Sequence, residues 1–462
     1  MTSTTERPAG LALLAVLTPA LLATVVASDM VNLMLPAIGA EFGASEAELA
    51  WVVTGFLLVF SIGIPLYGRI SDRVSLQRLF VFALLAYAAG SLVCALAPNL
   101  PVLVLGRIAT GVGAAAIPVL SIIAVTRLLP PDRRGTGIGV VSAAAGVGTA
   151  AGPAIGGGIG QLLGWPALFW LMFAVALVLL PAAWRVLPGE PPAGAGRFDL
   201  AGGILMGLGA GSVLYGITQA QVAGVTAASS WGSLAVAVVA LALFGWRTVR
   251  VAEPFVPPEL FTNRVFRTAV GVAFLAMVVN LGALVFVPLL LVDVNGLAPG
   301  EGALVMIPAG IAVAALSPLV GRLADRVGAR PLVLTGLTAM FVFALFLSTV
   351  TGAIPAGVGV LGISVGFLLV LTPIISAAAS ALPPTQVGAG LGILQGAQFL
   401  GAGTGPALFG VLVSAREQSG GALNPLYTGH DGAAFSDAFL AMAVVTVVSL
   451  VVAFRMRPEV SR

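Results

Sequence analysis

The sequence has little charge, almost no sulfur chemistry and no lysine. Only 8% of its 462 residues are charged and 59% are hydrophobic, whereas a soluble protein keeps about a quarter of its residues charged. So few charges cannot cover a water-exposed surface, and we therefore expect an integral membrane protein. All 21 basic residues are arginine, which together with the richness in alanine and glycine is typical of a GC-rich bacterial genome.

The missing residue types also exclude several classes of function. A single cysteine, Cys94, cannot form an intramolecular disulfide, and the single His430 offers no cluster for a metal ion. A Walker-type phosphate loop needs a lysine, so ATP cannot drive this chain. Scarce histidine and acidic residues argue against a membrane enzyme and against a bound cofactor. The scattered arginines argue against nucleic-acid binding, and no repeated charged pore segment suggests a channel.

Fourteen apolar segments are long enough to cross a bilayer, which takes about 20 helical residues. They lie near 11–38, 50–68, 79–97, 101–128, 135–162, 165–186, 199–220, 230–249, 265–292, 301–321, 331–350, 355–381, 387–414 and 433–455. The first segment is too long for the core of a signal peptide, so we expect it to be retained. If both termini face the cytoplasm, only Arg416 falls in an outer loop, which agrees with the positive-inside rule.

Two stretches of the chain are near copies, Pro65–Val74 and Pro318–Val327, and they lie 318 − 65 = 253 positions apart. The pairs Gly152-Pro153 and Gly405-Pro406 keep the same offset, which indicates two structurally repeated halves. The sequence therefore predicts an all-α polytopic membrane protein. Its predicted parts are a cytoplasmic N-terminus at 1–10, a six-helix bundle at 11–186, two inserted membrane helices with cytoplasmic linkers at 187–264, a second six-helix bundle at 265–455 and a cytoplasmic C-terminus at 456–462.

The repeated stretch resembles the signature of the major facilitator superfamily, Gly-x-x-x-Asp-Arg, between the second and third helices. The first copy carries it as Gly68, Asp72 and Arg73, although Ser75 and Gln77 depart from the family pattern. The second copy matches more fully, with Gly321, Asp325 and Arg326, which makes the first copy the weaker candidate.

The chemistry of this motif is readable from its residue types. Gly68 allows two backbones to approach closely, Asp72 can accept hydrogen bonds from a helix N-terminus, and Arg73 can pair with an acidic or carbonyl group. We expect the two copies to act as a latch that stabilises one of two packings of the halves. The alternative is a pair of tight turns without a gating role.

A second motif, Gly-x-x-x-Gly-Pro-x-x-Gly-Gly, lies in the fifth predicted helix. It comprises Gly148, Gly152, Pro153, Gly156 and Gly157. This string resembles one found in the fourteen-helix drug:proton antiporters of the same superfamily, which export their substrates. Glycines at i, i+4 and i+8 form a flat face, and proline bends the helix. We expect this face to contact the opposite half, the alternative being ordinary packing of small residues.

Two intramembrane charges have no counterpart in the repeat. With the offset of 253, Asp29 corresponds to Gly282 and Arg107 corresponds to Val360. The segment around Asp29 and Asn32 resembles the first helix of these antiporters, and the segment around Arg107 resembles the fourth. Ionisable residues inside a membrane are usually functional, so we predict that Asp29 and Arg107 couple transport to protons. A static ion pair between the two helices is the alternative.

Six further residues are candidates for the substrate pocket: Asn32, Phe56, Phe60, Asn280, Gln395 and Gln398. The amides among them could equally form hydrogen bonds between helices. The resemblance implies proton-coupled efflux of small lipophilic drugs or antibiotics by alternating access, with a proton-linked transporter of one specific metabolite as the alternative. The implied partners are the substrate, protons and lipid, for a monomer in the bacterial cytoplasmic membrane.

Overall fold

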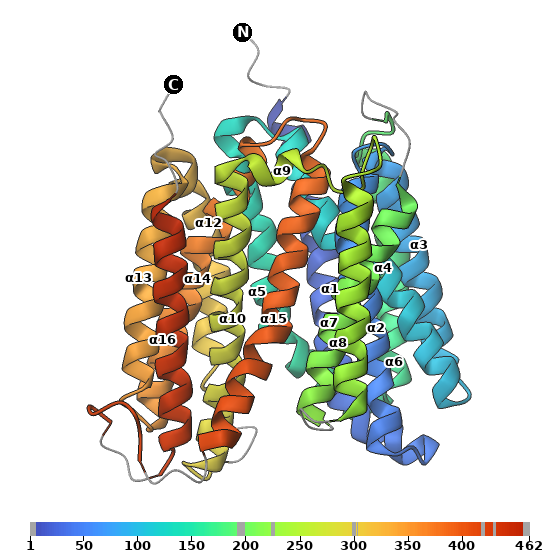
Figure 1. Cartoon of the computed structure of the whole chain (residues 1–462). Helices are drawn as coiled ribbons and strands as arrows, with labels where there is room; N and C mark the ends of the chain where they lie inside the picture. Colours follow the sequence, from blue (N-terminus) through green and yellow to red (C-terminus); the bar gives the residue numbers. More distant parts are fainter. Residues whose placement is uncertain are drawn as a thin grey trace. The chain divides into compact units, whose positions relative to one another are not determined.

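The structure is a computed structural model that describes residues 6–191, 199–222, 227–297, 302, 304–416, 421–427 and 431–455. Its regular elements in these ranges are helices (Figure 1). The long ones are α1 (Glu6–Phe42), α2 (Glu46–Ile70), α3 (Leu76–Ala95), α4 (Leu100–Leu128), α5 (Arg134–Leu163), α6 (Pro166–Val186), α7 (Leu200–Val222), α8 (Ala228–Thr248), α10 (Arg264–Asp293), α12 (Ile307–Val327), α13 (Ala329–Leu347), α14 (Ala353–Ser380), α15 (Val387–Arg416) and α16 (Ala433–Phe454). A 3-10 turn η1 (Pro131–Arg133) precedes α5, and a short helix α9 (Glu259–Thr262) precedes α10.

Each predicted apolar segment coincides with one of these long helices. Within the described ranges, 12 helices are long and apolar enough to cross a membrane. The count of fourteen spans and the cytoplasmic position of the termini stay predictions. Two boundaries differ from the expectation. Helix α1 begins at Glu6, inside the predicted N-terminal tail, and α12 begins at Ile307 rather than near 301 and runs on to Val327.

Local sequence signals explain where several helices begin and end. The Ser45 hydroxyl accepts the Glu48 N–H at 3.4 Å while the Glu48 carboxylate accepts the Ser45 N–H at 2.9 Å, a reciprocal capping box at the start of α2. Asn99 caps α4 by accepting the Val102 N–H at 3.1 Å. Helices α5 and α12 both end at glycines with positive φ, Gly164 at 81° and Gly328 at 78°.

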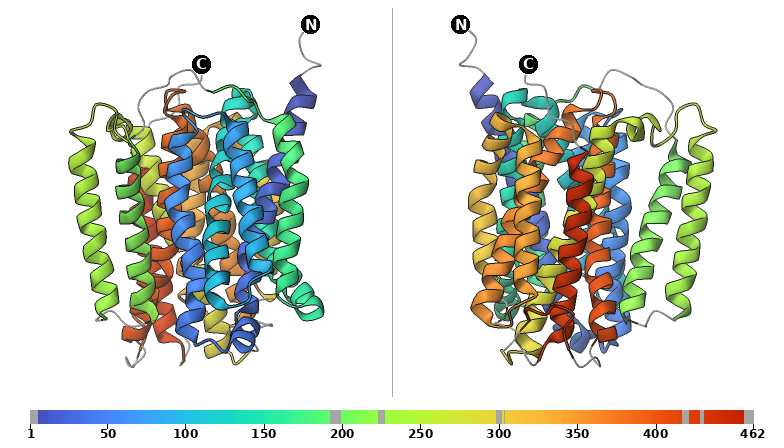
Figure 2. Two further views of the ribbon diagram at one scale, coloured as in Figure 1. Left: turned by 90° about the vertical axis from the view of Figure 1, so that its right-hand side faces the viewer. Right: turned by 60° about the vertical axis from the view of Figure 1, so that its left-hand side comes forward.

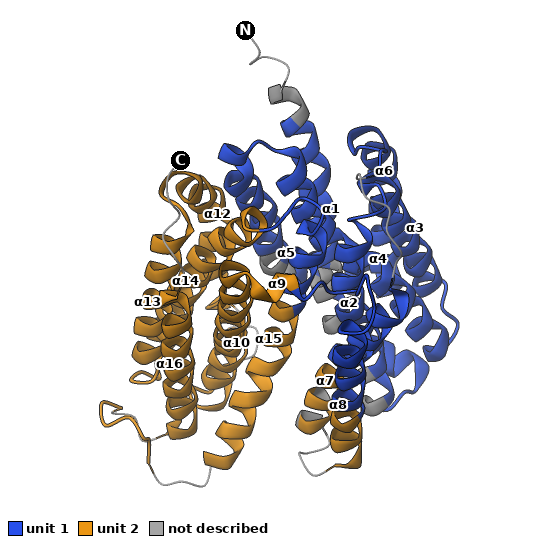
Figure 3. Ribbon diagram, turned by 45° about the horizontal axis from the view of Figure 1, so that its top comes forward, with its two compact units in different colours: residues 1–211, 236–258, 382–396 blue, residues 212–235, 259–381, 397–462 orange. Residues whose placement is uncertain are grey.

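The chain divides into two compact units, drawn in blue and orange in Figure 3. Unit 1 holds residues 1–211, 236–258 and 382–396, and unit 2 holds residues 212–235, 259–381 and 397–462. The first turns of α15 therefore belong to unit 1, although they come from the second half of the sequence repeat. The domain boundaries expected from the sequence stay a prediction.

The same pattern of helix packing occurs inside each unit. In unit 1, α4 packs against α2 and α3, while α6 packs against α1 and α3. In unit 2, α14 packs against α12 and α13, while α16 packs against α10 and α13. These are the same pairs once the helices are matched in chain order, α1 with α10, α2 with α12, α3 with α13, α4 with α14 and α6 with α16. The repeat in the sequence is therefore also a repeat of helix packing.

The glycine face of α5 packs on α1. A methyl group built on Gly148 would lie 2.9 Å from Val25 Cβ, so only glycine allows this approach. The equivalent Gly401 of α15 lies equally close to α10, with Phe274 O only 2.6 Å from its built Cβ. Gly148 therefore packs against α1 of its own half, and the expected contact of the whole motif face with the opposite half stays a prediction. The packing of Pro153, Gly156 and Gly157 lies outside the described part of the chain.

The inserted helices α7 and α8 lie side by side (Figure 2). Leu241 of α8 covers Gly209 of α7, and Leu234 covers Gly216. Helix α7 also packs on α2, where Ile62 lies against both Gly207 and Gly211. The insert is thus in contact with the helix that carries the first copy of the repeated motif.

Candidate functional site

The junction between α2 and α3 holds a buried carboxylate, Asp72, whose residue surface is only 5% exposed. Its Oδ1 accepts the Gly388 N–H and its Oδ2 accepts the Ala389 N–H, both at 2.9 Å. These amides belong to the first turn of α15, where backbone N–H groups have no partner within the helix and the helix dipole favours an anion. The hydrogen bonds predicted for Asp72 with a helix N-terminus are therefore confirmed.

Two arginines flank the same carboxylate. Arg127 Nη2 lies 2.5 Å from Asp72 Oδ1, while Arg127 Nη1 donates to the Ser71 carbonyl at 2.6 Å. Arg69 Nη1 lies 3.7 Å from Asp72 Oδ2. Burial raises the pKa of the Asp72 carboxyl above its ordinary value, and Arg127 and the two amides of α15 offset that rise only in part. We refer to Asp72, Arg127, Arg69 and the α15 amides as the Asp72 network.

Glycines bring α2 and α15 together around this network. A methyl group built on Gly68 would lie 2.5 Å from Gly388 O and 2.7 Å from Gly392 Cα. One built on Gly392 would lie 3.1 Å from both Gly68 Cα and Pro65 Cα. Real Cβ atoms do not approach backbone as closely as the distances at Gly68 would require, and the distances at Gly392 are at the tight limit, so a glycine at 68 is what lets the two helices meet here. The prediction that Gly68 allows a close approach of two backbones is confirmed.

Arg73 has an acidic partner, as its position suggested. Its Nη2 lies 3.1 Å from Glu253 Oε2, and the neighbouring Arg69 Nη2 donates to the Pro254 carbonyl at 3.3 Å. Both partners come from the segment that follows α8. Sequence reasoning did not single out Glu253, because it lies 180 residues from Arg73 in a linker without a motif. It also missed Arg127, whose one signal was its place at the end of an apolar segment.

The second copy of the motif has a different environment. Gly321 is buried, Asp325 is half-buried and Arg326 is exposed, and all three lie inside the last turns of α12. Asp72, by contrast, comes two residues after α2 ends. The copy with the weaker sequence match therefore holds the buried network.

The two departures from the family pattern in the first copy have local uses. The Ser75 hydroxyl accepts the Arg78 N–H at 3.4 Å and so caps α3. The Gln77 side chain donates to the Trp184 carbonyl at the end of α6, and its backbone N–H donates to the Pro188 carbonyl. Residues that weaken the motif match therefore stabilise the start of α3 and its contact with α6.

Arg107 is buried in the bundle of unit 1, with 1% of its surface exposed. Gly106 lies so close to Cys94 of α3 that a built Cβ would be 2.6 Å from the sulfur, which draws this part of α4 inward. Arg107 Nε donates to the Val52 carbonyl at 3.2 Å, and its guanidinium carbon lies 4.2 Å from the centre of the Phe56 ring. Its Nη1 has no hydrogen-bond partner among the described groups.

The predicted partners of Arg107 are only partly visible. Asp29 and Asn32 are carried by α1, but their side chains lie outside the described residues. Phe56 and Phe60 stack with ring centres 5.5 Å apart, and both are buried. The pairing of Asp29 with Arg107 stays a prediction.

Three buried amide side chains keep an unpaired polar atom. In the part of the chain that the structure describes, Asn280 Oδ1, Gln395 Nε2 and Gln398 Nε2 have no hydrogen-bond partner. Their residues are 5% to 7% exposed. A buried polar atom without a partner costs about 1–3 kcal/mol, so such atoms are rare unless a ligand or water pairs with them. Whether these amides line a pocket or bond between helices stays a prediction.

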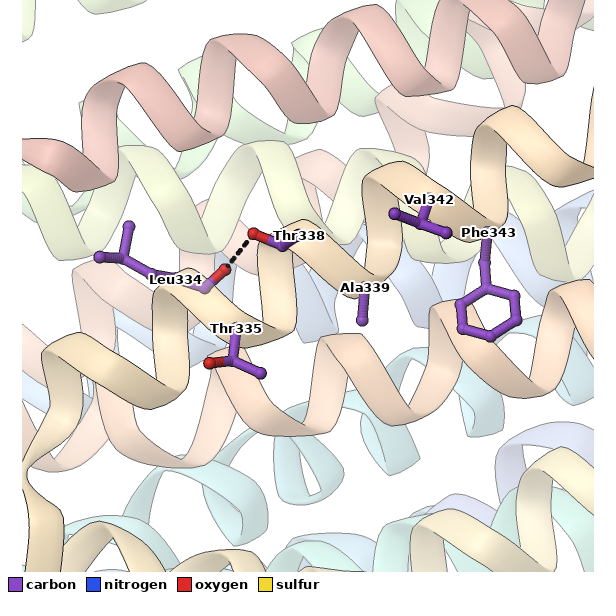
Figure 4. A pocket seen from close by; sticks show the side chains of 6 residues that line it. All are labelled: Leu334, Thr335, Thr338, Ala339, Val342 and Phe343. Carbon is purple, nitrogen blue, oxygen red and sulfur yellow. Dashed lines mark hydrogen bonds between the residues drawn. The ribbon is translucent and has the colours of Figure 1, made fainter.

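A cavity of about 470 Å³ lies along one face of α13 (Figure 4). It is lined by Leu334, Thr335, Thr338, Ala339, Val342 and Phe343, all from that one helix. The Thr335 and Thr338 hydroxyls donate to the Pro331 and Leu334 carbonyls of the same helix, at 2.9 and 2.8 Å. The two hydroxyls therefore keep only acceptor capacity for a ligand, and the hollow contains none of the predicted pocket residues.

Comparison with known proteins agrees with this architecture. A profile of the Major Facilitator Superfamily matches residues 17–406 and 272–462. Multidrug resistance protein Stp of Mycobacterium tuberculosis is 30% identical over 391 residues, 84% of this chain and 72% of that protein. Lincomycin resistance protein LmrB of Listeria monocytogenes is 27% identical over 391 residues, 84% of this chain and 83% of that protein.

Solved structures share the fold at low sequence identity. The human organic anion transporter MFSD10 (TETRAN) has a TM-score of 0.70 and 17% identity, covering 98% of this chain and 100% of that one. The proton:xylose symporter XylE has a TM-score of 0.70 and 16% identity, covering 98% of this chain and 97% of that one. At such identities the likeness concerns the fold alone.

Proposed function

Because the chain belongs to the Major Facilitator Superfamily of membrane transporters, we propose that it exports small lipophilic drugs or antibiotics in exchange for protons, by alternating access. Its relatives are named for multidrug resistance and lincomycin resistance, which supports this class of substrate. We place it in a bacterial cytoplasmic membrane as a monomer. The observation that carries the coupling mechanism is Arg107, a buried cation whose Nη1 has no partner among the described residues and whose position the sequence repeat does not duplicate.

The proposed proton carrier is Asp29, with Arg107 as its partner. A carboxylate binds a proton less readily beside a cation and more readily when it is buried in apolar surroundings. A change of packing that moves Asp29 relative to Arg107 therefore changes its proton affinity between the two access states. The ring of Phe56 and the Val52 carbonyl hold the arginine in place, which leaves Nη1 as the donor for a carboxylate. Substrate that binds near Asp29 displaces the proton and so couples the two fluxes.

The Asp72 network is the proposed latch. Its charge-assisted bonds form only while the first turn of α15 lies against α2, so they stabilise one arrangement of the helices over another. Gly68 and Arg73 belong to the same junction. We propose a second, weaker latch at Gly321, Asp325 and Arg326, whose carboxylate is less buried.

For the proposed substrate site we keep the residues that the sequence indicated, the aromatic pair Phe56 and Phe60 and the amides Asn32, Asn280, Gln395 and Gln398. Apolar surface supplies most of the binding free energy, and a few polar groups select and orient the ligand. Among the residues that the structure describes, Nε2 of Gln395 and Nε2 of Gln398 have no hydrogen-bond partner, which favours a substrate with hydrogen-bond acceptors.

Transport by purified protein in liposomes tests the proposal. With an imposed pH gradient, lipophilic cations, tetracyclines, macrolides, lincosamides and dyes are screened for substrate-dependent proton release. Asp29→Asn should abolish uphill export at near-normal protein levels, while Glu190→Gln, a change of an exposed carboxylate in a linker, should not. Uphill export by Asp29→Asn would rule out the proton-carrier role. Silence across the whole panel, with uptake of a nutrient instead, would favour the specific metabolite transporter.

A further inference from the structure

The two inserted helices have no role in the proposed transport cycle, yet the segment that follows them reaches the latch. We infer that Glu253, Pro254 and Phe255 form a strap that ties α7 and α8 to the Asp72 network, with Glu253 as a positioning residue for that network. The strap rests on the proposed function only for its effect on turnover, because its contacts are independent of the substrate.

One end of the strap is fixed to the base of both inserted helices through Asp199. Its Oδ1 accepts the Gly202 N–H at 3.0 Å, which caps α7, and the Arg247 Nε–H at 2.7 Å, from the end of α8. Its Oδ2 accepts the Phe255 N–H at 3.3 Å. A single carboxylate therefore joins the start of α7, the end of α8 and the strap.

Apolar packing fixes the same end. Phe255 is only 2% exposed and its ring lies against Gly203 of α7, where a built Cβ would be 2.8 Å from Cε2. Gly202 lies equally close, with a built Cβ 3.0 Å from Phe255 Cβ. The inserted pair and the strap therefore form one packed body, in which a shift of α7 also moves Phe255.

The other end of the strap holds the two arginines of the repeated motif. Glu253 Oε2 lies 3.1 Å from Arg73 Nη2, and the Pro254 carbonyl accepts Arg69 Nη2 at 3.3 Å. Arg69 is the same residue whose Nη1 lies 3.7 Å from Asp72. The strap thus directly positions Arg69, a cation of the Asp72 network. The two strap residues that hold the arginines, Glu253 and Pro254, are adjacent in the chain.

The strength of this connection suits an element that opens and closes. The Glu253 side chain is 49% exposed and Arg73 is 14% exposed, so water and salt compete for the pair. Pairs of this kind shift an equilibrium by about 1.5- to 5-fold. The strap therefore biases the latch without locking it, and the inserted helices adjust the lifetime of the contact between α2 and α15.

Hydrogen exchange at the start of α15 tests the strap without any substrate. The Gly388 and Ala389 amides bond to Asp72, so the exchange rate of peptides covering 387–392 reports opening of the latch. In lipid nanodiscs at low salt, Glu253→Gln should raise that rate by about 1.5- to 5-fold, while Glu253→Asp, which keeps the charge, should raise it less. Wild-type protein at high salt should resemble Glu253→Gln at low salt, and Glu190→Gln should resemble the wild type throughout.

Two outcomes would overturn the inference. The first is an unchanged exchange rate at 387–392 in Glu253→Gln, which would show that the ion pair does not act on the network. The second is a rise of the same size in peptides from α13 and α14, which would mean general loss of stability. Failure of every compound in the transport screen would instead count against the proposed function, since the exchange measurement would still decide the strap.

Discussion

Replacing Gly388 with alanine should open the contact between α2 and the start of α15. A methyl group there would lie 2.5 Å from Asp72 Oδ1 and even closer to the Gly68 carbonyl and the Ser71 hydroxyl. Gly396, two turns further along the same helix, offers a matched control. Its built Cβ comes no nearer than 3.8 Å to any neighbour, the Pro65 ring, which is an ordinary contact.

The size of the effect follows from the distances. Ordinary carbon contacts lie at about 3.5–4.0 Å, so Gly388→Ala must move the helices apart by roughly 1 Å. The bonds from Gly388 and Ala389 to Asp72 then lengthen from 2.9 Å to well beyond hydrogen-bonding distance. Overpacking of this kind costs about 1–3 kcal/mol, which corresponds to about 5- to 150-fold in the population of the closed contact.

Both substitutions replace glycine by alanine inside a helix, which by itself stabilises the helix by about 0.5–1 kcal/mol. The comparison therefore isolates the clash. We expect Gly388→Ala to unfold at a lower temperature than Gly396→Ala. The fluorescence of the chain's 6 tryptophans measures the unfolding temperature of each variant. We also expect its efflux from proteoliposomes to be slower, because the latch no longer closes. Equal unfolding temperatures and equal efflux in the two variants would refute the close approach as a requirement of transport.

Two further variants test other parts of the site. Burial alone would raise the pKa of Asp199, but hydrogen bonds from the Gly202 N–H, Arg247 and the Phe255 N–H outweigh it and hold the pKa below its usual range. Its stabilising effect is therefore present above the unfolded value of about 3.9 and is lost as the pH falls through the lower folded value. Asp199→Asn should unfold at a lower temperature by a constant difference between pH 6 and pH 8, and the difference should shrink below about pH 4; a gap that instead grew on acidification would contradict this. Gln398→Met removes a buried Nε2 that has no partner among the described residues, so it should unfold no earlier than the wild type but raise the KM for an exported compound by about two- to tenfold. An unchanged KM would remove Gln398 from the substrate site.

The helices could be read from the sequence because each depends on local properties. A run of about 20 apolar residues has to form a helix in a bilayer, where every backbone group needs a partner. Cap residues such as Asn99 act within one turn. The sequence repeat also predicted equivalent packing in the two halves, because segments with the same pattern of glycines pack on equivalent helices. Gly148 packs on α1, and the corresponding Gly401 packs on α10.

The sequence was less informative wherever the partner of a residue comes from a distant segment. The glycines of α5 indicated close packing but not which helix they meet. Arg127 and Glu253 carry no motif, yet they complete the environment of Asp72 and Arg73. The comparison of the two motif copies pointed to the second as the stronger latch, because Ser75 and Gln77 depart from the family pattern in the first copy. The structure shows that Ser75 caps α3 and that Gln77 bonds to α6, which the sequence did not indicate.

The sequence by itself determined that this chain is a helical membrane protein of two repeated halves with an insert between them. Composition and periodicity suffice for that, because they reflect the match of each segment to lipid or to its neighbours along the chain. Only the tertiary structure decided that Asp72 meets the first amides of α15 and that Arg107 Nη1 is left without a described partner. Hydrogen bonds and ion pairs act over about 3 Å, so they depend on which helix ends folding brings together, and no spacing within a single segment records that.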